Sequence, residues 1–162
     1  MELTFVQDRR RRLLQIDDAE LIFKNFEGRG DRYNREGERN CAVKIYDVET
    51  AEALQNDKNE MGASWNVKIK APRDEGDIPF MYLPVKVKFT GYGPQAFLIT
   101  GNRKVELTEE TIGMLDNIQI ERVDLDVRAY DDEANGKPFR AAYLDKIYVT
   151  QKTDRFTDRY DM

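Results

Sequence analysis

The stretch FMYLPVKVKF, residues 80–89, predicts a β-strand with two different faces. Successive side chains of an extended chain point to opposite sides. One side is apolar throughout and consists of Met81, Leu83, Val85, Val87 and Phe89. The other side consists of Phe80, Tyr82, Pro84, Lys86 and Lys88. The first side fits a hydrophobic core, whereas a solvent-facing surface has no structural need for aromatic rings beside ammonium groups.

The rest of the chain repeats this alternation in short segments separated by glycine-rich turns. The predicted strands are residues 19–26, 40–46, 65–70, 80–89, 95–101, 103–107, 120–130 and 139–150. Two short helices are predicted, over residues 47–58 with Asp47 as cap and over residues 107–117 with Thr108 as cap. Strands with one apolar face must curl to hide it, so the sequence predicts a mainly β fold, an OB-like β-barrel with two short α-helices.

The ends of the chain are more polar than its middle. Residues 1–19 carry the run Arg9 to Arg12 and are expected to form a basic N-terminal arm. Residues 20–150 form a single predicted domain, a size that buries a substantial core without metals or disulfides. Residues 151–162 have few apolar side chains and are expected to form a flexible C-terminal tail.

Composition restricts the chemistry that this chain can perform. The 162 residues include 26 basic and 31 acidic side chains, a net charge of −5, and no histidine. Without histidine there is no ordinary serine or cysteine triad and no histidine-liganded metal site. No phosphate-binding glycine loop of the Walker or dinucleotide type is present. The sequence therefore predicts a protein that is not an enzyme and that uses no cofactor.

The single cysteine, Cys41, excludes an internal disulfide and indicates a reducing compartment. The N-terminal residues lack the apolar run of a secretory signal. No window approaches the length and apolarity of a transmembrane span. We expect a cytoplasmic protein, in the host cytoplasm if a phage encodes it, with no membrane partner. The sequence leaves its oligomeric state open.

The aromatic and basic side of residues 80–89 suits single-stranded nucleic acid, whose exposed bases stack on rings while cations contact phosphates. Phe80 and Tyr82 are the candidate stacking platforms. The candidate phosphate contacts are Lys86, Lys88, Lys68 and Lys70. The alternative is that a loop or the N-terminal arm covers both rings and that the lysines only keep an edge strand soluble.

Two further groups of residues extend this hypothesis. Arg128 and Tyr130 share the outward side of a later strand. Arg29, Arg32 and Tyr33 lie in the loop of residues 27–39, which is expected to be mobile and able to close over a nucleic-acid strand. The acidic residues of that loop leave open the alternative of an ordinary solvated loop.

Asp124 and Asp126, two residues apart, raise the possibility of a magnesium-dependent nuclease. Such a site normally needs a third acidic ligand, and nothing nearby supplies one. Because Arg122 and Arg128 flank the pair on the same side, neighbouring salt bridges are the favoured interpretation.

The C-terminal third of the chain resembles the closing strands of phage single-stranded DNA-binding proteins of OB-fold type. In that family a strand of alternating valines ending in tyrosine precedes a short turn and a strand ending in an A-x-L-x-x-V/I-x-V pattern. The corresponding residues are Val123, Leu125, Val127, Tyr130, Gly136, Lys137, Ala142, Leu144, Ile147 and Val149. The segments IFKNF, NCAVKI and WNVKIKAPRDE are similar to uncharacterised phage proteins grouped with these binders.

This resemblance implies a non-catalytic protein that coats single-stranded DNA during phage replication or recombination with little sequence preference. Phage or host replication and recombination proteins are the candidate partners. The tail departs from the acidic tails of such proteins, because its three aspartates are balanced by Lys152, Arg155 and Arg159. The alternative function is a phage protein-interaction module, structural or host-inhibiting, that uses the same aromatic patch without binding DNA.

Overall fold

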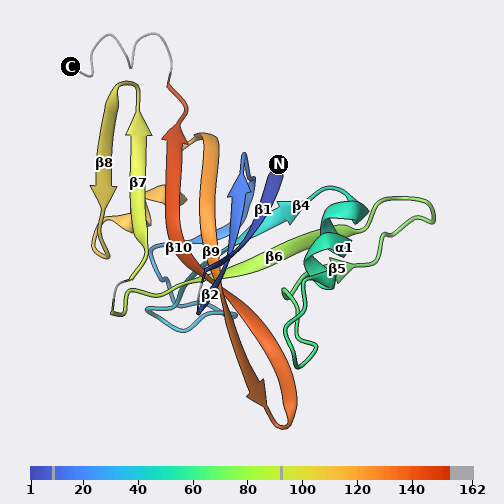
Figure 1. The fold of residues 1–162 in the computed structure, drawn as a ribbon. Helices are drawn as coiled ribbons and strands as arrows, with labels where there is room; N and C mark the ends of the chain where they lie inside the picture. The colour runs from blue at the N-terminus through green and yellow to red at the C-terminus, as the bar shows by residue number, and fades with distance from the viewer. Residues whose placement is uncertain (9, 92, 154–162) are drawn as a thin grey trace.

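A computed structural model describes residues 1–8, 10–91 and 93–153 (Figure 1). Strands dominate the described residues, with one α-helix and one 3-10 helix. The strands are β1 (Glu2–Asp8), β2 (Arg11–Asp17), β3 (Leu21–Asn25), β4 (Arg39–Ile45), β5 (Lys68–Lys70), β6 (Phe80–Val87), β7 (Gln95–Thr100), β8 (Arg103–Leu107), β9 (Ile120–Ala134) and β10 (Lys137–Gln151). The helices are α1 (Val48–Asn56) and η1 (Ile112–Asp116). The predicted mainly β class is confirmed.

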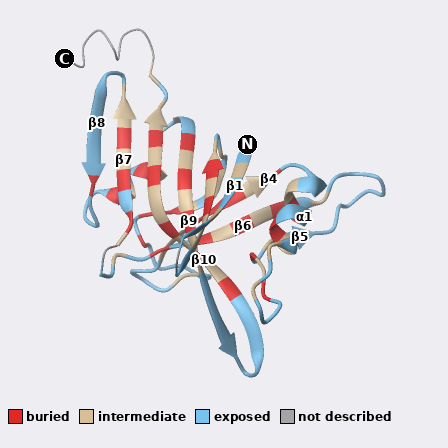
Figure 2. Ribbon diagram, in the orientation of Figure 1, coloured by how far each residue is buried: buried red, intermediate tan, exposed pale blue. Residues whose placement is uncertain are grey.

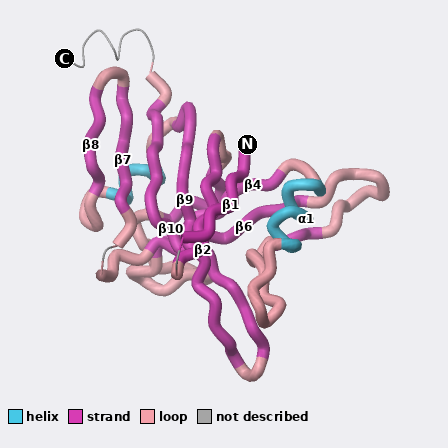
Figure 3. The backbone as a smooth tube through the Cα atoms, viewed as in Figure 1, coloured by secondary structure: helices cyan, strands magenta, loops and turns pink. Residues whose placement is uncertain are grey.

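The described strands join into a single curled sheet (Figure 3). Its main path runs β1-β2-β9-β10-β6-β4-β3, with β5 paired to β6 and with the β7-β8 hairpin paired to β10. The expected barrel is wrong in one respect, because no strand pairing within the described residues closes β3 onto β1. A single backbone hydrogen bond, from Ala19 N–H to the Val123 carbonyl, links the segment before β3 to β9 instead.

Strand β10 changes partner along its length. At its middle it pairs in parallel with β6, at Tyr143 opposite Lys86, and further on it pairs in parallel with β7. Its antiparallel register with β9 shifts between Leu144 and Lys146, which marks a β-bulge at Asp145. A bulge bends a strand and increases its twist, which allows one long strand to serve both parts of the sheet.

The β9-β10 hairpin extends beyond the sheet, and its outer part is exposed (Figures 1 and 2). Asn135 and Gly136 form its tip, with φ angles of 52° and 79°. Positive φ at both central residues is the geometry of a tight turn whose twist matches that of the strands, and Asn-Gly is the sequence that adopts it most readily. The local sequence therefore determines where this hairpin turns.

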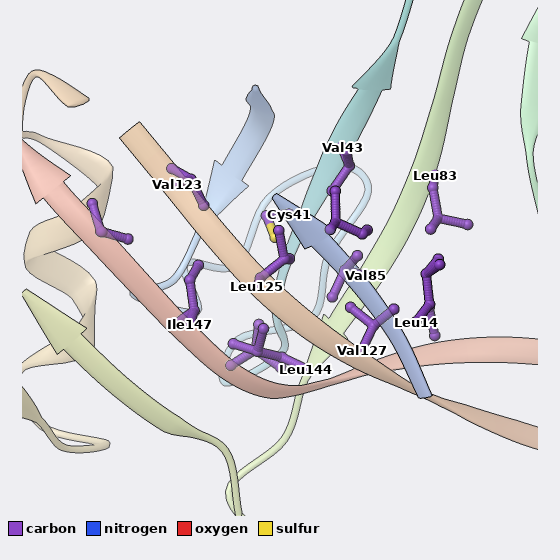
Figure 4. Close-up of a cluster of buried hydrophobic side chains, with 14 of the residues drawn as sticks. Leu14, Cys41, Val43, Leu83, Val85, Val123, Leu125, Val127, Leu144 and Ile147 are labelled. Atoms are coloured by element: carbon purple, nitrogen blue, oxygen red, sulfur yellow. The ribbon is translucent and has the colours of Figure 1, made fainter. Parts of the chain in front are cut away.

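The core lies on the concave side of the sheet and is formed by the apolar members of the alternating strands. Figure 4 shows side chains from β2, β4, β6, β9 and β10 directed into this space. The apolar row predicted on residues 80–89 supplies Met81, Leu83, Val85 and Val87, each at most 4% exposed. Trp65 is also buried, as predicted for a core side chain.

The expected N-terminal arm, residues 1–19, is wrong. These residues form the antiparallel β1-β2 hairpin, and β2 continues the sheet by pairing with β9. Leu14 and Ile16 are at most 1% exposed and belong to the core. The prediction failed because it rested on the four adjacent arginines, which indicate a solvated arm, and did not give weight to the alternating apolar residues Leu14 and Ile16.

The first predicted helix is confirmed as α1, whose cap Asp47 accepts a hydrogen bond from Thr50 N–H. The second is a short 3-10 helix that begins after Thr111 rather than Thr108. Ile112 and Leu115 are buried and three residues apart, which suits three residues per turn better than an α-helix. Neither helix of the described chain is long and apolar enough to cross a membrane.

Candidate nucleic-acid interface

Phe80 and Tyr82 lie on the convex face of β6, opposite the core, with ring centroids 5.6 Å apart. Phe80 is 36% exposed and Tyr82 is half-buried. Neither is covered by the N-terminal residues, because the β1-β2 hairpin pairs with β9, on the far side of β10 from β6. The alternative of rings hidden beneath an N-terminal arm is therefore excluded by the position of that hairpin.

The predicted lysines share this face. In the antiparallel pairing of β5 with β6, Lys68 is directly opposite Tyr82 and Lys70 is opposite Phe80, and both lysines are exposed. Directly opposed residues project to the same side of a sheet. Lys86 is exposed on the same side of β6, and Lys88 is exposed just beyond its end.

The sheet extends the same face from β6 into β10 and β9. Tyr143 of β10 is in register with both Lys86 and Arg128. The Lys86 ammonium lies 5.9 Å from the Tyr143 ring centroid, and the Arg128 guanidinium lies 5.6 Å from it. Tyr130 packs edge-on against the same ring at 5.7 Å. Arg128 and Tyr130, identified from the sequence, thus lie in one array with Lys86.

Three aromatic residues of this face were missed by the sequence analysis: Phe23, Phe139 and Tyr143. Alternation along β10 contained the signal for two of them, because Phe139 and Tyr143 have the parity opposite to the buried Ala142 and Leu144. Phe23 carried no such signal. It lies in a register shift between β3 and β4 with a φ of 52°, and this irregularity directs its ring onto Phe80 and Tyr82 at 6.1 and 5.3 Å.

The rings form two clusters on this face. The Phe80 cluster consists of Phe23, Phe80 and Tyr82. The Tyr143 cluster consists of Tyr130, Phe139 and Tyr143. A further missed cation, Lys44 of β4, is in register with Tyr82 and lies 5.8 Å from the Phe80 ring centroid. Each cluster therefore has at least one ammonium or guanidinium group in contact with a ring.

The loop between β3 and β4 reaches the edge of this face. Asn25 organises its start, because its side-chain oxygen accepts the N–H groups of Gly28 and Arg29. Asn34 accepts a hydrogen bond from the side chain of Asn40, the residue in register with Lys86.

The predicted binding residues of this loop are accessible. Arg29 forms an ion pair with Glu27 at 3.8 Å, and Arg32 is exposed. Tyr33 is 85% exposed and touches no other ring in the described chain.

A separate aromatic pair lies on the convex face of β7 and β10. Phe97 and Tyr148 stack with centroids 4.9 Å apart and planes inclined by 17°. The Lys104 ammonium lies 4.6 Å from the Phe97 centroid and 5.0 Å from the Tyr148 centroid. The acidic side chains Asp124 and Asp126 of β9 lie beside Tyr148 together with Lys146 of β10, so this stretch of the surface carries charges of both signs.

Those acidic side chains include the pair considered for a nuclease. Asp124 accepts hydrogen bonds from Arg122, as predicted, and from Asp18 N–H. Burial raises the pKa of Asp124, but these hydrogen bonds outweigh burial and hold the pKa below its ordinary value. Burial and the neighbouring Asp145 raise the pKa of Asp126. Among the described residues no group of three or more acidic or cysteine side chains is placed to hold a metal ion.

The fold and this face define a β-sheet protein whose convex surface suits single-stranded nucleic acid. The chain matches, over residues 4–162, the model of the family described as "Putative phage ssDNA-binding domain". The protein therefore belongs to this family of phage single-stranded DNA-binding domains. No curated protein matches the chain significantly.

The chain is also similar to solved structures from a bacteriophage. The single-stranded DNA-binding protein from bacteriophage Enc34 gives a TM-score of 0.52 at 12% identity, over 96% of this chain and 93% of that chain. Its C-terminal truncation gives 0.50 at 11% identity, over 94% and 97% of the two chains. Its complex with single-stranded DNA gives 0.48 at 12% identity, over 96% and 98%. The first two matches establish a shared fold.

Proposed function

We propose that the protein binds single-stranded DNA across the convex face of its sheet, by stacking bases on aromatic rings and contacting phosphates with lysine and arginine. Membership of the phage single-stranded DNA-binding family supports this function. The observation that carries the location is the arrangement of two ring clusters, each with a cation beside a ring, on the outer sides of adjoining strands.

The proposed path runs from the Phe80 cluster to the Tyr143 cluster, with Lys86 between them. Stacking of a base on an aromatic side chain contributes about 1–3 kcal/mol, and it tolerates any base because every base has a π face. Several rings acting together therefore provide affinity with little sequence preference. Lys68 and Lys70 flank the first cluster, and Arg128 and Lys88 extend the basic surface. Arg29, Arg32 and Tyr33 are proposed to close over the strand from the adjoining loop.

In this proposal the curled sheet provides an OB-type binding surface, and no chemical step follows binding. Coating of single-stranded DNA serves replication and recombination, so the proposed site of action is the host cytoplasm, with phage or host replication and recombination proteins as partners. The side chains on the face suit binding, because rings and cations are present and Asp124 is hydrogen-bonded to Arg122. Among the described residues no group of acidic side chains is placed to hold a metal ion.

The test is fluorescence anisotropy with labelled oligo-dT and with a duplex of equal length, across a salt series. We expect single-stranded DNA to bind more tightly than duplex and the affinity to fall steeply with salt. The double substitution Phe80→Ala and Tyr82→Ala should weaken binding at least tenfold, from the loss of two stacking platforms. Phe5→Ala is the matched control, because Phe5 is an exposed ring in register with the core residue Leu14 and so projects from the opposite face.

Preference for duplex, or an unchanged affinity in the double variant, would contradict the proposal. A complete lack of DNA binding at low salt, combined with a stable complex with a host protein, would instead support the protein-interaction alternative.

A further inference from the structure

A groove opens along the edge of β6 that faces away from β4, at the point where β5 and β10, the two strands paired to that edge, separate. The residues at the start of β6, Phe80 to Tyr82, pair with β5, and Lys86 pairs with β10. Pro84 lies between these pairings, where a missing N–H removes no hydrogen bond to either partner. The groove has a volume of about 530 Å³ and lies between the segment of residues 62–67 and the start of β10. This volume is within the range of about 300–1,000 Å³ typical of small-ligand sites.

The groove is continuous with the proposed DNA path. Lys86, between the two ring clusters, and Phe139, a member of the Tyr143 cluster, both line it. Phe139 is 38% exposed, so its ring is accessible to a stacked group. A base displaced from the path beside Tyr143 could therefore enter the groove while its phosphate stays near the Lys86 ammonium.

A buried arginine fixes the two walls of the groove. The Arg140 side chain, fully buried on β10, donates to both carboxylate oxygens of Asp131 at 2.6 and 3.0 Å and to the Asp57 carbonyl at 2.8 Å. Its guanidinium lies 5.0 Å from the Trp65 ring, and Trp65 donates to Asp57. These bonds tie the β9-β10 hairpin to the segment after α1, so the groove is preformed.

The groove also presents polar side chains that are accessible to a ligand. Gln55, Ser64 and Asn66 line it, and none of their side chains makes a hydrogen bond to the described part of the chain. Glutamine and asparagine amides each offer two donors and an acceptor, which match the hydrogen-bonding edges of a nucleobase. In single strands those edges are free for recognition by side chains.

We propose that this groove is a base-recognition subsite, which takes one nucleobase out of the stacked path, packs it against Phe139 and reads its edge with Gln55, Ser64 and Asn66. The subsite rests on the proposed function, and it adds a modest base preference to binding that is otherwise indifferent to sequence.

The experiment compares labelled dA, dC and dT oligonucleotides of equal length by anisotropy at one salt concentration. Wild-type protein should bind its best homopolymer about fivefold or more tightly than its weakest, as expected for one well-formed contact to a base edge. The double substitution Gln55→Ala and Asn66→Ala should bring the three affinities together and leave the salt dependence unchanged. Asn56→Ala, an exposed amide next to Gln55 and outside the groove, should keep the wild-type ranking.

Side-chain amide signals of Gln55 and Asn66 in NMR spectra give a second measurement, and they should shift when the preferred oligonucleotide is added. Equal wild-type affinities for the three homopolymers, or a ranking preserved in the double variant, would overturn the subsite and leave the proposed function intact. Failure of wild-type protein to bind any of the oligonucleotides would reject both.

Discussion

Lys86 and Tyr143 face each other across the single parallel register pair that joins β6 to β10, and the ammonium lies 5.9 Å from the ring centroid. This pair lies between the two ring clusters, at the junction where β6 pairs with β10. Lys86 also lines the groove next to it. One cation therefore occupies the point at which the proposed DNA path, the groove and the strand junction meet.

Replacement of Lys86 should weaken binding to single-stranded DNA more at low salt than at high salt. Each phosphate contact to a single strand contributes about 0.7 to the slope of log affinity against log salt. We expect Lys86→Ala to reduce that slope by about this amount. Lys58→Ala removes an exposed ammonium that touches no ring of the described chain and should leave the slope unchanged. Equal slopes for the two variants would contradict a phosphate contact at Lys86.

Phe23 should contribute to binding as much as Phe80 does, because both rings belong to one cluster. Phe23 is 61% exposed, so its removal costs little core packing. Phe23→Ala should weaken oligo-dT binding by about 5- to 150-fold, which corresponds to about 1–3 kcal/mol of stacking. Anisotropy titration measures this change, and thermal unfolding checks that the variant is folded. An affinity equal to that of Phe5→Ala would remove Phe23 from the site.

Sequence alternation was sufficient to predict the face of β6, because the period of a strand fixes which residues point outward. It also placed Lys68 and Lys70 on a strand, but their positions opposite Tyr82 and Phe80 depend on pairing register, which no local pattern specifies. Phe23 was inaccessible to such reasoning, since a register shift and a left-handed backbone direct its ring.

The open sheet and the N-terminal hairpin were missed for a different reason. An apolar face has to be covered, but the sequence does not state which segment covers it. Leu14 and Ile16 serve this purpose from within a basic stretch. The groove depends on the separation of β5 and β10 beside Pro84, a relationship between segments far apart in the chain. The predicted tail beyond residue 153 lies outside the described residues.

Asp126 should destabilise the protein at neutral pH. Burial and the charge of Asp145 raise its folded-state pKa above 3.8, so the stability associated with the protonated carboxyl is present below 3.8 and is lost as pH rises through the raised value. We expect Asp126→Asn to unfold at a higher temperature than wild type at pH 7, with a gain that shrinks as pH approaches 4. The same variant should bind oligo-dT more tightly at low salt, because one negative charge leaves the convex face.

Asp124→Asn is the matched control for that change and should have the opposite effect. Burial raises the pKa of Asp124, but the hydrogen bonds from Arg122 and Asp18 N–H outweigh it and lower the pKa. Its loss should therefore reduce the unfolding temperature at pH 7. Two variants that shift the unfolding temperature in the same direction would contradict this assignment of the two carboxylates.

Asp131 should stabilise the hairpin through Arg140, with a pH dependence opposite to that of Asp126. Burial raises its pKa, but hydrogen bonds from Arg140 and Asn59 outweigh burial and hold the pKa below 3.8. The resulting stability is present above pH 3.8 and is lost as pH falls through the lower folded-state value. Asp131→Asn should reduce the free energy of unfolding by about 2 kcal/mol at pH 7, as expected for a hydrogen-bonded charge left without its partner. Denaturant unfolding at pH 7, 4 and 3 measures the difference from wild type, which should persist at pH 4 and decrease at pH 3.

Glu133→Gln, an exposed carboxylate of the same hairpin without an ion pair in the described chain, should change the stability little at any of these pH values. A difference for Asp131→Asn that stays constant from pH 7 to pH 3 would show that the carboxylate charge is not what holds Arg140 and the groove walls together.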